Sequence, residues 1–405
     1  MTVNNERIET FTIFWMIVSS GFVVLNYIFM LPCMMVLLVL ALLYLRTNKT
    51  ISKENGFVLL GILVFTAITE FYTLVFVRKY PFVMNSLIIL IIRVFCLAVI
   101  QSNITAESFK RKYVDIITGI CMVSLVCYVM VNVMGLSLPF TGTYGDSNYY
   151  GTFYYQVKFG SIMEVRNSGP YGEAGMFAIA IILALAFLLL SENYNNEKGY
   201  ITKIIILVIT LLSTQSGTGM VCFAILLFVF ICKDGFSLST LKNPLMLLVV
   251  IFMVVGFYYA ESTYGIIEYK VINQGGSYST RMEDTLKGYE IAAENLFTGT
   301  GICNDYTEAW IGKTTESRSN GLANLAASTG YLFLAFYIAR LIKQCHIYMN
   351  NRFVYTFALV CILICVYNTQ PVVMQTIGLS YLFAWKKEYE EVDLSLERSK
   401  QNDNV

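Results

Sequence analysis

Long apolar runs separated by short polar stretches constrain this 405-residue chain more than any other feature. One of them, Ala174–Leu190, contains no polar side chain at all. About 20 such residues span the hydrocarbon core of a bilayer, and short or interrupted helices use fewer. Hydrophobic residues make up 57% of the chain and charged residues only 14%, too few to cover a soluble protein of this length. The sequence therefore predicts an all-α polytopic membrane protein. The net charge of +1 gives no reason to expect nucleic acid as a partner.

About twelve transmembrane helices are expected from these runs. The first run is too long for one span, and Asn26 and Pro32 divide it into two short helices joined by a tight turn. The predicted spans are Phe11–Leu45 (a pair), Gly56–Val77, Pro81–Gln101, Val114–Leu138, Ala174–Leu190, Ile204–Leu212, Met220–Cys232, Pro244–Ala260, Gly321–Ile342, Phe353–Asn368 and Pro371–Trp385.

The short loops predict the orientation of the chain in the membrane. Lys and Arg concentrate in the loops after the even-numbered spans and in the tail, so both termini are expected in the cytoplasm. Two long loops then share the outer face and are expected to form a helical cap. The predicted parts are N-terminal transmembrane helices 1–138, a first outer loop 139–173, central helices 174–260, a large outer loop 261–320, C-terminal helices 321–385 and a disordered tail 386–405.

The large outer loop, Glu261–Asn320, is the longest polar interval and carries five basic and nine acidic residues. Long loops of this kind are usually functional. Thr280 and Glu283 have the spacing of a capping box, which predicts a helix that begins there. A stripe of apolar residues at helical spacing follows and is expected to face the membrane: Met282, Leu286, Tyr289, Ala293 and Leu296. Arg281 in the first turn opposes the helix dipole, which points to another role, although such residues are not rare.

In the first outer loop, Arg166-Asn-Ser-Gly-Pro-Tyr-Gly-Glu-Ala-Gly175 leads directly into an apolar span. Its Gly and Pro residues predict a tight, defined backbone at the membrane surface. Arg166 and Glu173 would lie close to the helix start, where free N–H groups attract anions. An ordinary surface loop, with Glu173 interacting with the helix dipole, explains the same residues about as well.

The stretch Ser213–Gly219 is rich in small residues and predicts a tight hairpin between two spans. Its hydroxyl and amide groups could bind a ligand. Close packing of helices through small residues is the commoner reason for such a composition.

Glu70 and Arg93 lie inside two neighbouring predicted spans. A charge within the membrane suggests function by default. The two residues are predicted to lie at similar depth, so we favour a structural ion pair that locks the hairpin.

Three motifs together resemble those of the O-antigen polymerase and ligase superfamily. Arg166…Gly169…Glu173-Ala-Gly175 is similar to its Arg…Gly…Glu-Pro-Gly signature, and Ser216-Gly-Thr-Gly219 is similar to its Ser-Arg-Thr-Gly hairpin. The large-loop pattern of the family is matched by Arg281…Asn295-Leu-Phe-Thr-Gly299-Thr-Gly301…Ser319-Asn320-Gly321…Gly330. Each motif is degenerate, and their order and spacing carry the resemblance over roughly Arg166–Arg340.

This resemblance implies a GT-C-like glycosyltransferase of the bacterial cytoplasmic membrane. Such an enzyme extends O-antigen, capsular or exopolysaccharide chains. It would transfer a growing glycan from undecaprenyl diphosphate to the non-reducing end of another lipid-linked repeat unit, with no cofactor and no metal. Ser319 stands where the ligases have a His that is proposed to activate the acceptor, which favours a repeat-unit polymerase over a ligase. Ala174 replaces the Pro of the signature, and Gly217 replaces the hairpin Arg.

The implied partners are the lipid-linked repeat units, the bilayer, a chain-length regulator and a flippase. Arg166 and Arg281 are the expected diphosphate ligands, since Arg makes bidentate contacts with phosphate. Glu173 is expected either to act as base or to orient Arg166. The weaker candidates for substrate binding are Arg318, Asn320, Gly169, Gly175, Gly299 and Gly301. An O-antigen ligase-type transferase and a flippase or other transporter for lipid-linked oligosaccharides are the alternatives.

Overall fold

The computed structural model describes most of the chain. The described residues are 2–23, 30–47, 50–77, 84–144, 147–151, 153–159, 162–163, 165–191, 199–231, 277–303 and 320–387. The predicted span Pro244–Ala260, the tail beyond Lys387, and most of the two segments that flank residues 277–303 lie outside them.

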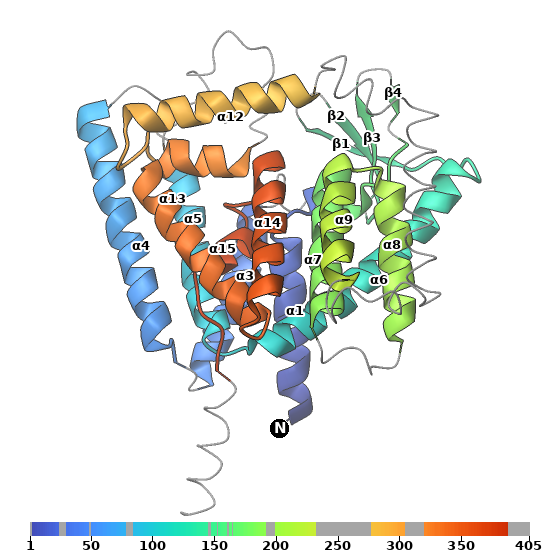
Figure 1. Ribbon diagram of the computed structural model, residues 1–405, viewed down its shortest axis with the longest axis horizontal. Coiled ribbons are helices and arrows are strands. Elements are labelled where there is room, and N and C mark those ends of the chain that lie inside the picture. Colours follow the sequence, from blue (N-terminus) through green and yellow to red (C-terminus); the bar gives the residue numbers. More distant parts are fainter. Residues whose placement is uncertain are drawn as a thin grey trace, which may run out of the picture.

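The described chain is mostly helical, and its longer helices run up and down between two ends of a bundle (Figure 1). They are α1 (Thr2–Val18), α3 (Met30–Arg46), α4 (Lys53–Tyr72) with the π-helical turn η1 (Thr73–Val77), α5 (Met84–Gln101), α6 (Ala106–Asn132), α7 (Ala174–Leu190), α8 (Tyr200–Thr214), α9 (Gly217–Ile231), α13 (Gly321–Tyr348) and α14 (Phe353–Thr369).

Helix α7 lies at the centre of the bundle. Its apolar sequence has no polar face, and fourteen of its residues are buried. A helix that is apolar on all sides belongs in the interior. It packs against α6, α8 and α9, so the chain segment that enters α7 at its upper end is held by the core of the protein.

Four of the described helices are long and apolar enough to cross a membrane: Lys53–Phe76, Met84–Gln101, Ala106–Asn132 and Gly321–Tyr348. Five shorter apolar helices accompany them: α3, α7, α8, α9 and α14. Large apolar side chains are exposed along all of these helices except the central α7, as expected for surfaces that face lipid. The helices support a helical membrane protein, while the expected number of twelve spans is not established.

The predicted last span, Pro371–Trp385, is not a membrane-length helix, so the prediction is wrong about its helical structure. Only α15 (Thr376–Ser380) is helical there. The segment nevertheless passes from one end of the bundle to the other, because it follows α14 at the upper end and the Lys386 N–H reaches the carbonyls of Gln101 and Ile104 at the lower end. Irregular backbone is tolerated at membrane depth where protein surrounds it, and most of this segment is buried.

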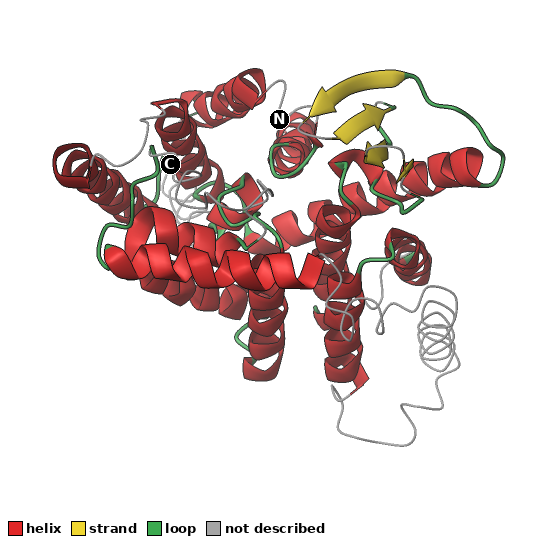
Figure 2. Ribbon diagram, turned by 90° about the horizontal axis from the view of Figure 1, so that it is seen from above, coloured by secondary structure: helices red, strands yellow, loops and turns green. Residues whose placement is uncertain are grey.

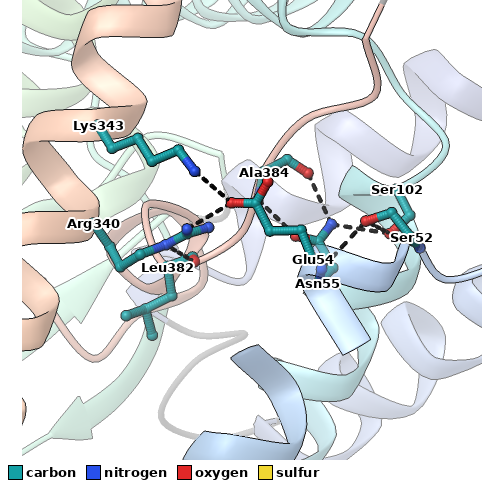
Figure 3. A network of polar contacts seen from close by, with 8 residues as sticks. All are labelled: Ser52, Glu54, Asn55, Ser102, Arg340, Lys343, Leu382 and Ala384. Atoms are coloured by element: carbon teal, nitrogen blue, oxygen red, sulfur yellow. Dashed lines mark hydrogen bonds and ion pairs between the residues drawn. The ribbon is translucent and has the colours of Figure 1, made fainter. Parts of the chain in front are cut away.

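Polar contacts fix the end of this segment at the lower end of the bundle (Figure 3). Arg340 of α13 donates to the Leu382 carbonyl at 2.7 Å and pairs with Glu54 at 2.6 Å. The side chain of Asn55 makes two hydrogen bonds with the backbone of Ala384. These contacts place Lys386 near the start of α6. Lys386 forms an isolated β-bridge with Thr105, the residue before α6.

The first outer loop is a β-sheet, so the prediction of a wholly helical cap is wrong for this loop. The strands are β1 (Phe140–Tyr144), β2 (Ser147–Tyr150), β3 (Gln156–Phe159) and β4 (Ile162–Met163), paired antiparallel in chain order. Tyr144 pairs with Ser147 across the first turn, and Tyr150 pairs with Gln156 across the second connection. Aromatic, Thr and Val side chains favour such strands. Gly145-Asp146 between two such runs is a hairpin signal that the sequence reading missed.

Helix α12 (Ser277–Glu294) lies across the upper end of the bundle, the end that also carries the sheet (Figures 1 and 2). It packs along the first part of α13, where Gly288 of α12 approaches Ala323 so closely that a Cβ would lie 2.8 Å from the Ala323 Cβ. Helix α13 is then bent at Gly330, whose φ of 78° and ψ of 171° are not helical. The bend turns α13 from beneath α12 down into the bundle (Figure 1).

Candidate functional site

The segment that carries Arg166 is anchored on both sides by buried polar side chains. Asn167 is fully buried, donates to the Ser213 hydroxyl at the end of α8 and accepts from the Ser124 hydroxyl of α6. Ser168 donates to the Tyr155 carbonyl beside the sheet. These bonds fix the backbone next to Arg166, whose own side chain is half-buried. Gly169 follows in a short 3₁₀ turn, η2 (Gly169–Tyr171), with a φ of 50° and packed against the Phe177 ring.

Glu173 is the N-cap residue of α7, but its carboxylate makes no hydrogen bond to that helix. Glu173 is exposed, and its Oε1 accepts a hydrogen bond of 2.7 Å from the side-chain amide of Gln370, a buried residue that follows α14. Gly175 makes this contact possible, because a Cβ there would lie 2.5 Å from the Gln370 Nε2. The predicted substrate-binding role of Gly175 stays a prediction, and the structure gives this glycine a packing role.

Asn320 closes the large outer loop and is the N-cap residue of α13. Its Oδ1 accepts from the Ala323 N–H at 2.9 Å, so its side chain caps the helix. Its Nδ2 donates to Thr285 of α12 at 2.7 Å and to Asn368 of α14 at 3.2 Å. Only 1% of Asn320 is exposed. This residue therefore joins three helices, which explains its buried position without reference to a ligand.

Gly299 and Gly301, predicted to bind substrate, lie in the segment 296–301, whose backbone is hydrogen-bonded to the bend of α13. This segment is called the clasp below. The N–H groups of Thr300 and Gly301 donate to the carbonyls of Ala327 and Ser328, and the Tyr331 N–H donates to the Leu296 carbonyl. Gly299 and Gly330 both have positive φ. A Cβ on either residue would lie only 2.6 Å from a backbone atom of the facing segment. Glycine is the residue that adopts such angles without strain. The glycine spacing of this motif is therefore explained by the bend.

Helix α12 differs from its prediction at the start and has the predicted apolar face, whose contact with the membrane stays a prediction. The helix begins at Ser277, three residues before Thr280, so Thr280 is not its N-cap residue. One face carries apolar side chains, as predicted, and it is exposed: Leu286 is 62% exposed. The opposite face, with Asp284, Ile291 and Ala292, is buried against the protein. Arg281 is half-buried in the second turn, and its carbonyl accepts from the Thr285 hydroxyl.

The small-residue stretch Ser213–Gly219 forms the predicted tight hairpin between α8 and α9. Gln215 takes a left-handed conformation at the turn, with a φ of 49°. A Cβ on Gly219 would lie 3.0 Å from the Ala178 Cβ of α7, so this glycine allows close helix packing. At Gly217 the superfamily that the motifs resemble commonly has Arg. In the described part of the chain, a Cβ on Gly217 would face open space, with no packed heavy atom within 4 Å.

The predicted ion pair between Glu70 and Arg93 is not formed, although both residues are described. Glu70 instead accepts hydrogen bonds from the backbone N–H groups of Ile302 and Cys303, at 2.5 and 3.3 Å. Arg93 donates to the Met374 carbonyl and to the Gln375 side chain, in the irregular segment around α15. The prediction failed because two non-helical segments supply the partners that each charge requires: backbone N–H groups for Glu70, and a backbone carbonyl and a side-chain amide oxygen for Arg93. Glu70 thereby holds the chain just after α12 to the top of α4.

Cys303 is buried next to Glu70 at this junction. Burial, together with the nearby Glu70 carboxylate, raises the pKa of the Cys303 thiol to about 12. The raised pKa disfavours the thiolate, which is the nucleophilic form of cysteine.

Two outer segments far apart in the sequence are thus brought together by one short stretch. The predicted residues Glu173 and Asn320 contact Gln370 and Asn368, respectively, at the end of α14. The sequence reading missed Asn368 and Gln370. A polar interruption before Pro371, between two apolar runs, is the signal that marks them. Arg318 and Ser319 lie outside the described residues, and the distance between Arg166 and Arg281 stays untested.

No family model matches this chain, and no curated protein matches it. Among solved structures, the chain is similar to one described as "Structural coordination of polymerization and crosslinking by a peptidoglycan synthase complex". The alignment covers 80% of this chain and 96% of that chain, at 13% sequence identity and a TM-score of 0.33. An alignment with this score does not establish a common fold.

Proposed function

We propose that this protein is a metal-independent polysaccharide polymerase of the bacterial cytoplasmic membrane. It transfers a growing glycan from undecaprenyl diphosphate to the non-reducing end of another lipid-linked repeat unit on the outer face of the membrane. The observation that carries this proposal is the meeting of both outer segments at the end of α14, through the Glu173–Gln370 and Asn320–Asn368 contacts. The order of the sequence motifs supports it independently.

The two arginines of the proposal lie on elements at the same end of the bundle. Arg166 is seven residues before Glu173 on an anchored segment, and Arg281 is on α12, which packs over α13 (Figure 1). A diphosphate gains negative charge as it leaves, and preorganised guanidinium groups stabilise that charge in the transition state. Both arginines are half-buried, so each could reach a ligand and also be held in place.

The transfer is a substitution at the anomeric carbon of the growing glycan. The acceptor hydroxyl forms the new C–O bond, and the bond to the diphosphate breaks with its electron pair on the leaving phosphate oxygen. The hydroxyl proton goes to the Glu173 carboxylate, which is exposed and bonded through one oxygen to Gln370. If Glu173 orients Arg166 instead, the proton is released to solvent.

Conservative substitutions of the arginines test the diphosphate contacts. Arg166→Lys and Arg281→Lys keep the positive charge and lose the bidentate geometry. Loss of one such donor costs about 3–4 kcal/mol of barrier, so each variant should form polymer on the order of a hundred- to a thousandfold more slowly. Arg46→Lys, on an exposed arginine at the other end of the bundle, is the matched control. Long polymer from both lysine variants at normal rates would refute the diphosphate contacts.

Cells that lack the gene test the reaction itself. We expect lipid-linked single repeat units to accumulate on the outer leaflet, because the polymerase would consume them there. Accumulation on the inner leaflet would instead indicate a flippase. Long polymer that never reaches its final anchor would indicate a ligase.

A further inference from the structure

Gln370 belongs to none of the sequence motifs, and only the polar interruption before Pro371 marks its position in the sequence. It is the C-cap residue of α14, and its extended backbone, with a φ of −144° and a ψ of 140°, turns the chain out of the helix. Its backbone N–H still donates to the Val366 carbonyl. Only 4% of Gln370 is exposed, so its side chain is enclosed by the protein.

The side chain of Gln370 reaches a carboxylate that belongs to a different part of the chain. Its Nε2 lies 2.7 Å from Oε1 of Glu173, across 197 positions of sequence. A hydrogen bond to a charged acceptor is stronger than one between neutral groups and restricts the acceptor's orientation. Among the described residues, Gln370 is the one hydrogen-bond donor to this carboxylate, which leaves Oε2 for other partners.

The same stretch of chain also contacts the second outer segment. Asn368, two residues earlier, accepts a hydrogen bond from Asn320, which in turn donates to Thr285 of α12. The Gln370 carbonyl lies against Gly321, only 2.7 Å from where a Cβ would be. Both outer segments therefore contact the same turn at the end of α14.

We propose that Gln370 is a positioning residue for the transfer reaction. Its amide holds the Glu173 carboxylate in the orientation that the reaction requires, and Asn368 fixes the large outer segment at a set distance from it. This inference rests on the proposed function and assigns residues that act through Glu173. If the contact were only structural, any hydrogen-bonded pair at positions 173 and 370 would support polymer formation. If Gln370 positions a reacting group, polymer formation also requires a carboxylate at position 173.

The first experiment compares Gln370→Leu with the reciprocal exchange Glu173→Gln/Gln370→Glu. Polymer formation is followed in membranes of the deletion strain, with the host's own lipid-linked repeat unit as substrate, and thermal stability is measured on the purified proteins. Gln370→Leu should slow polymer formation by about tenfold to a hundredfold, the effect of a small misplacement of a reacting group. The exchange restores an amide–carboxylate hydrogen bond, so it should recover stability but not polymer formation.

Gln344→Leu is the matched control. Gln344 is fully buried in the last part of α13, and in the described part of the chain neither of its amide atoms has a hydrogen-bond partner. Its replacement should leave polymer formation unchanged. Normal polymer formation by Gln370→Leu would overturn the proposal. Full recovery of polymer formation by the reciprocal exchange would also overturn it, because the contact would then be structural only.

A thermodynamic cycle separates this inference from the proposed function. The melting temperatures of the wild type, Glu173→Ala, Gln370→Ala and the double variant report the coupling between the two side chains without any assay of activity. If the two side chains are coupled but the wild-type protein forms no polymer, the contact is real, and both the proposed function and the positioning role are refuted. Absence of coupling in an active wild type would refute the positioning role alone.

Discussion

Glu70 is predicted to stabilise the junction between the top of α4 and the chain after α12. Glu70 is 5% exposed, and its carboxylate accepts two backbone N–H groups, from Ile302 and Cys303. Glu70→Leu keeps the side chain's approximate size and removes both acceptors. Net contributions of hydrogen bonds to charged groups are about 1.5–3 kcal/mol each. Because the released N–H groups can partly rehydrate, we expect a loss of about 3 kcal/mol in the stability of this junction.

A loss of that size is measurable as local opening. It corresponds to an increase on the order of a hundredfold in the open population. Cys303 is buried at the junction and reports opening through its reaction with a maleimide, located by peptide mass spectrometry. In the wild type this reaction is slow, because the thiol is buried and its pKa is raised to about 12. Glu70→Leu should accelerate it on the order of a hundredfold well below the melting temperature.

Two control variants separate the causes of this acceleration. Glu70→Gln removes the charge that helps to raise the Cys303 pKa but keeps an oxygen acceptor, so it should give only a small acceleration. Arg93→Met should leave Cys303 protected, since Arg93 contacts Met374 and Gln375 instead of Glu70. Equal labelling in Arg93→Met and Glu70→Leu, or continued protection of Cys303 in Glu70→Leu, would refute the reasoning.

Two further substitutions test the clasp and the helix cap through the melting temperature of the purified protein. Gly330→Ala places a Cβ 2.6 Å from the backbone of Phe297 on a residue with a φ of 78°, so it should destabilise the protein by about 2–4 kcal/mol. Gly217→Ala is the control and should cost less than about 1 kcal/mol, because its Cβ meets no packed atom in the described part of the chain. Equal effects of the two would contradict the role of the bend. Asn320→Ala should cost about 2–3 kcal/mol, because it removes the cap and both cross-helix hydrogen bonds, and Asn320→Ser, which keeps a capping oxygen, should recover about 1 kcal/mol of this. No difference between Ala and Ser would show that the cap contributes nothing.

The sequence alone determined the elements that local pattern controls. The run Ala174–Leu190 was predicted with the bounds that α7 has, because its apolar residues end at polar ones on both sides. The Ser213–Gly219 hairpin and the apolar face of α12 were also readable from the spacing of small and apolar residues. Hydrophobic periodicity and small-residue composition are properties of neighbouring residues, so they need no tertiary information.

Only the tertiary structure decided which distant groups meet. Glu70 and Arg93 each predictably require a partner. Glu70 finds backbone N–H groups after α12, and Arg93 finds the Met374 carbonyl and the Gln375 side chain near α15. The irregular crossing of Pro371–Trp385 is likewise set by surrounding helices that satisfy its polar groups. A buried charge requires some partner, but many donors and acceptors can meet that requirement. The packing of the whole chain selects among them, and in the same way it brings Gln370 to Glu173.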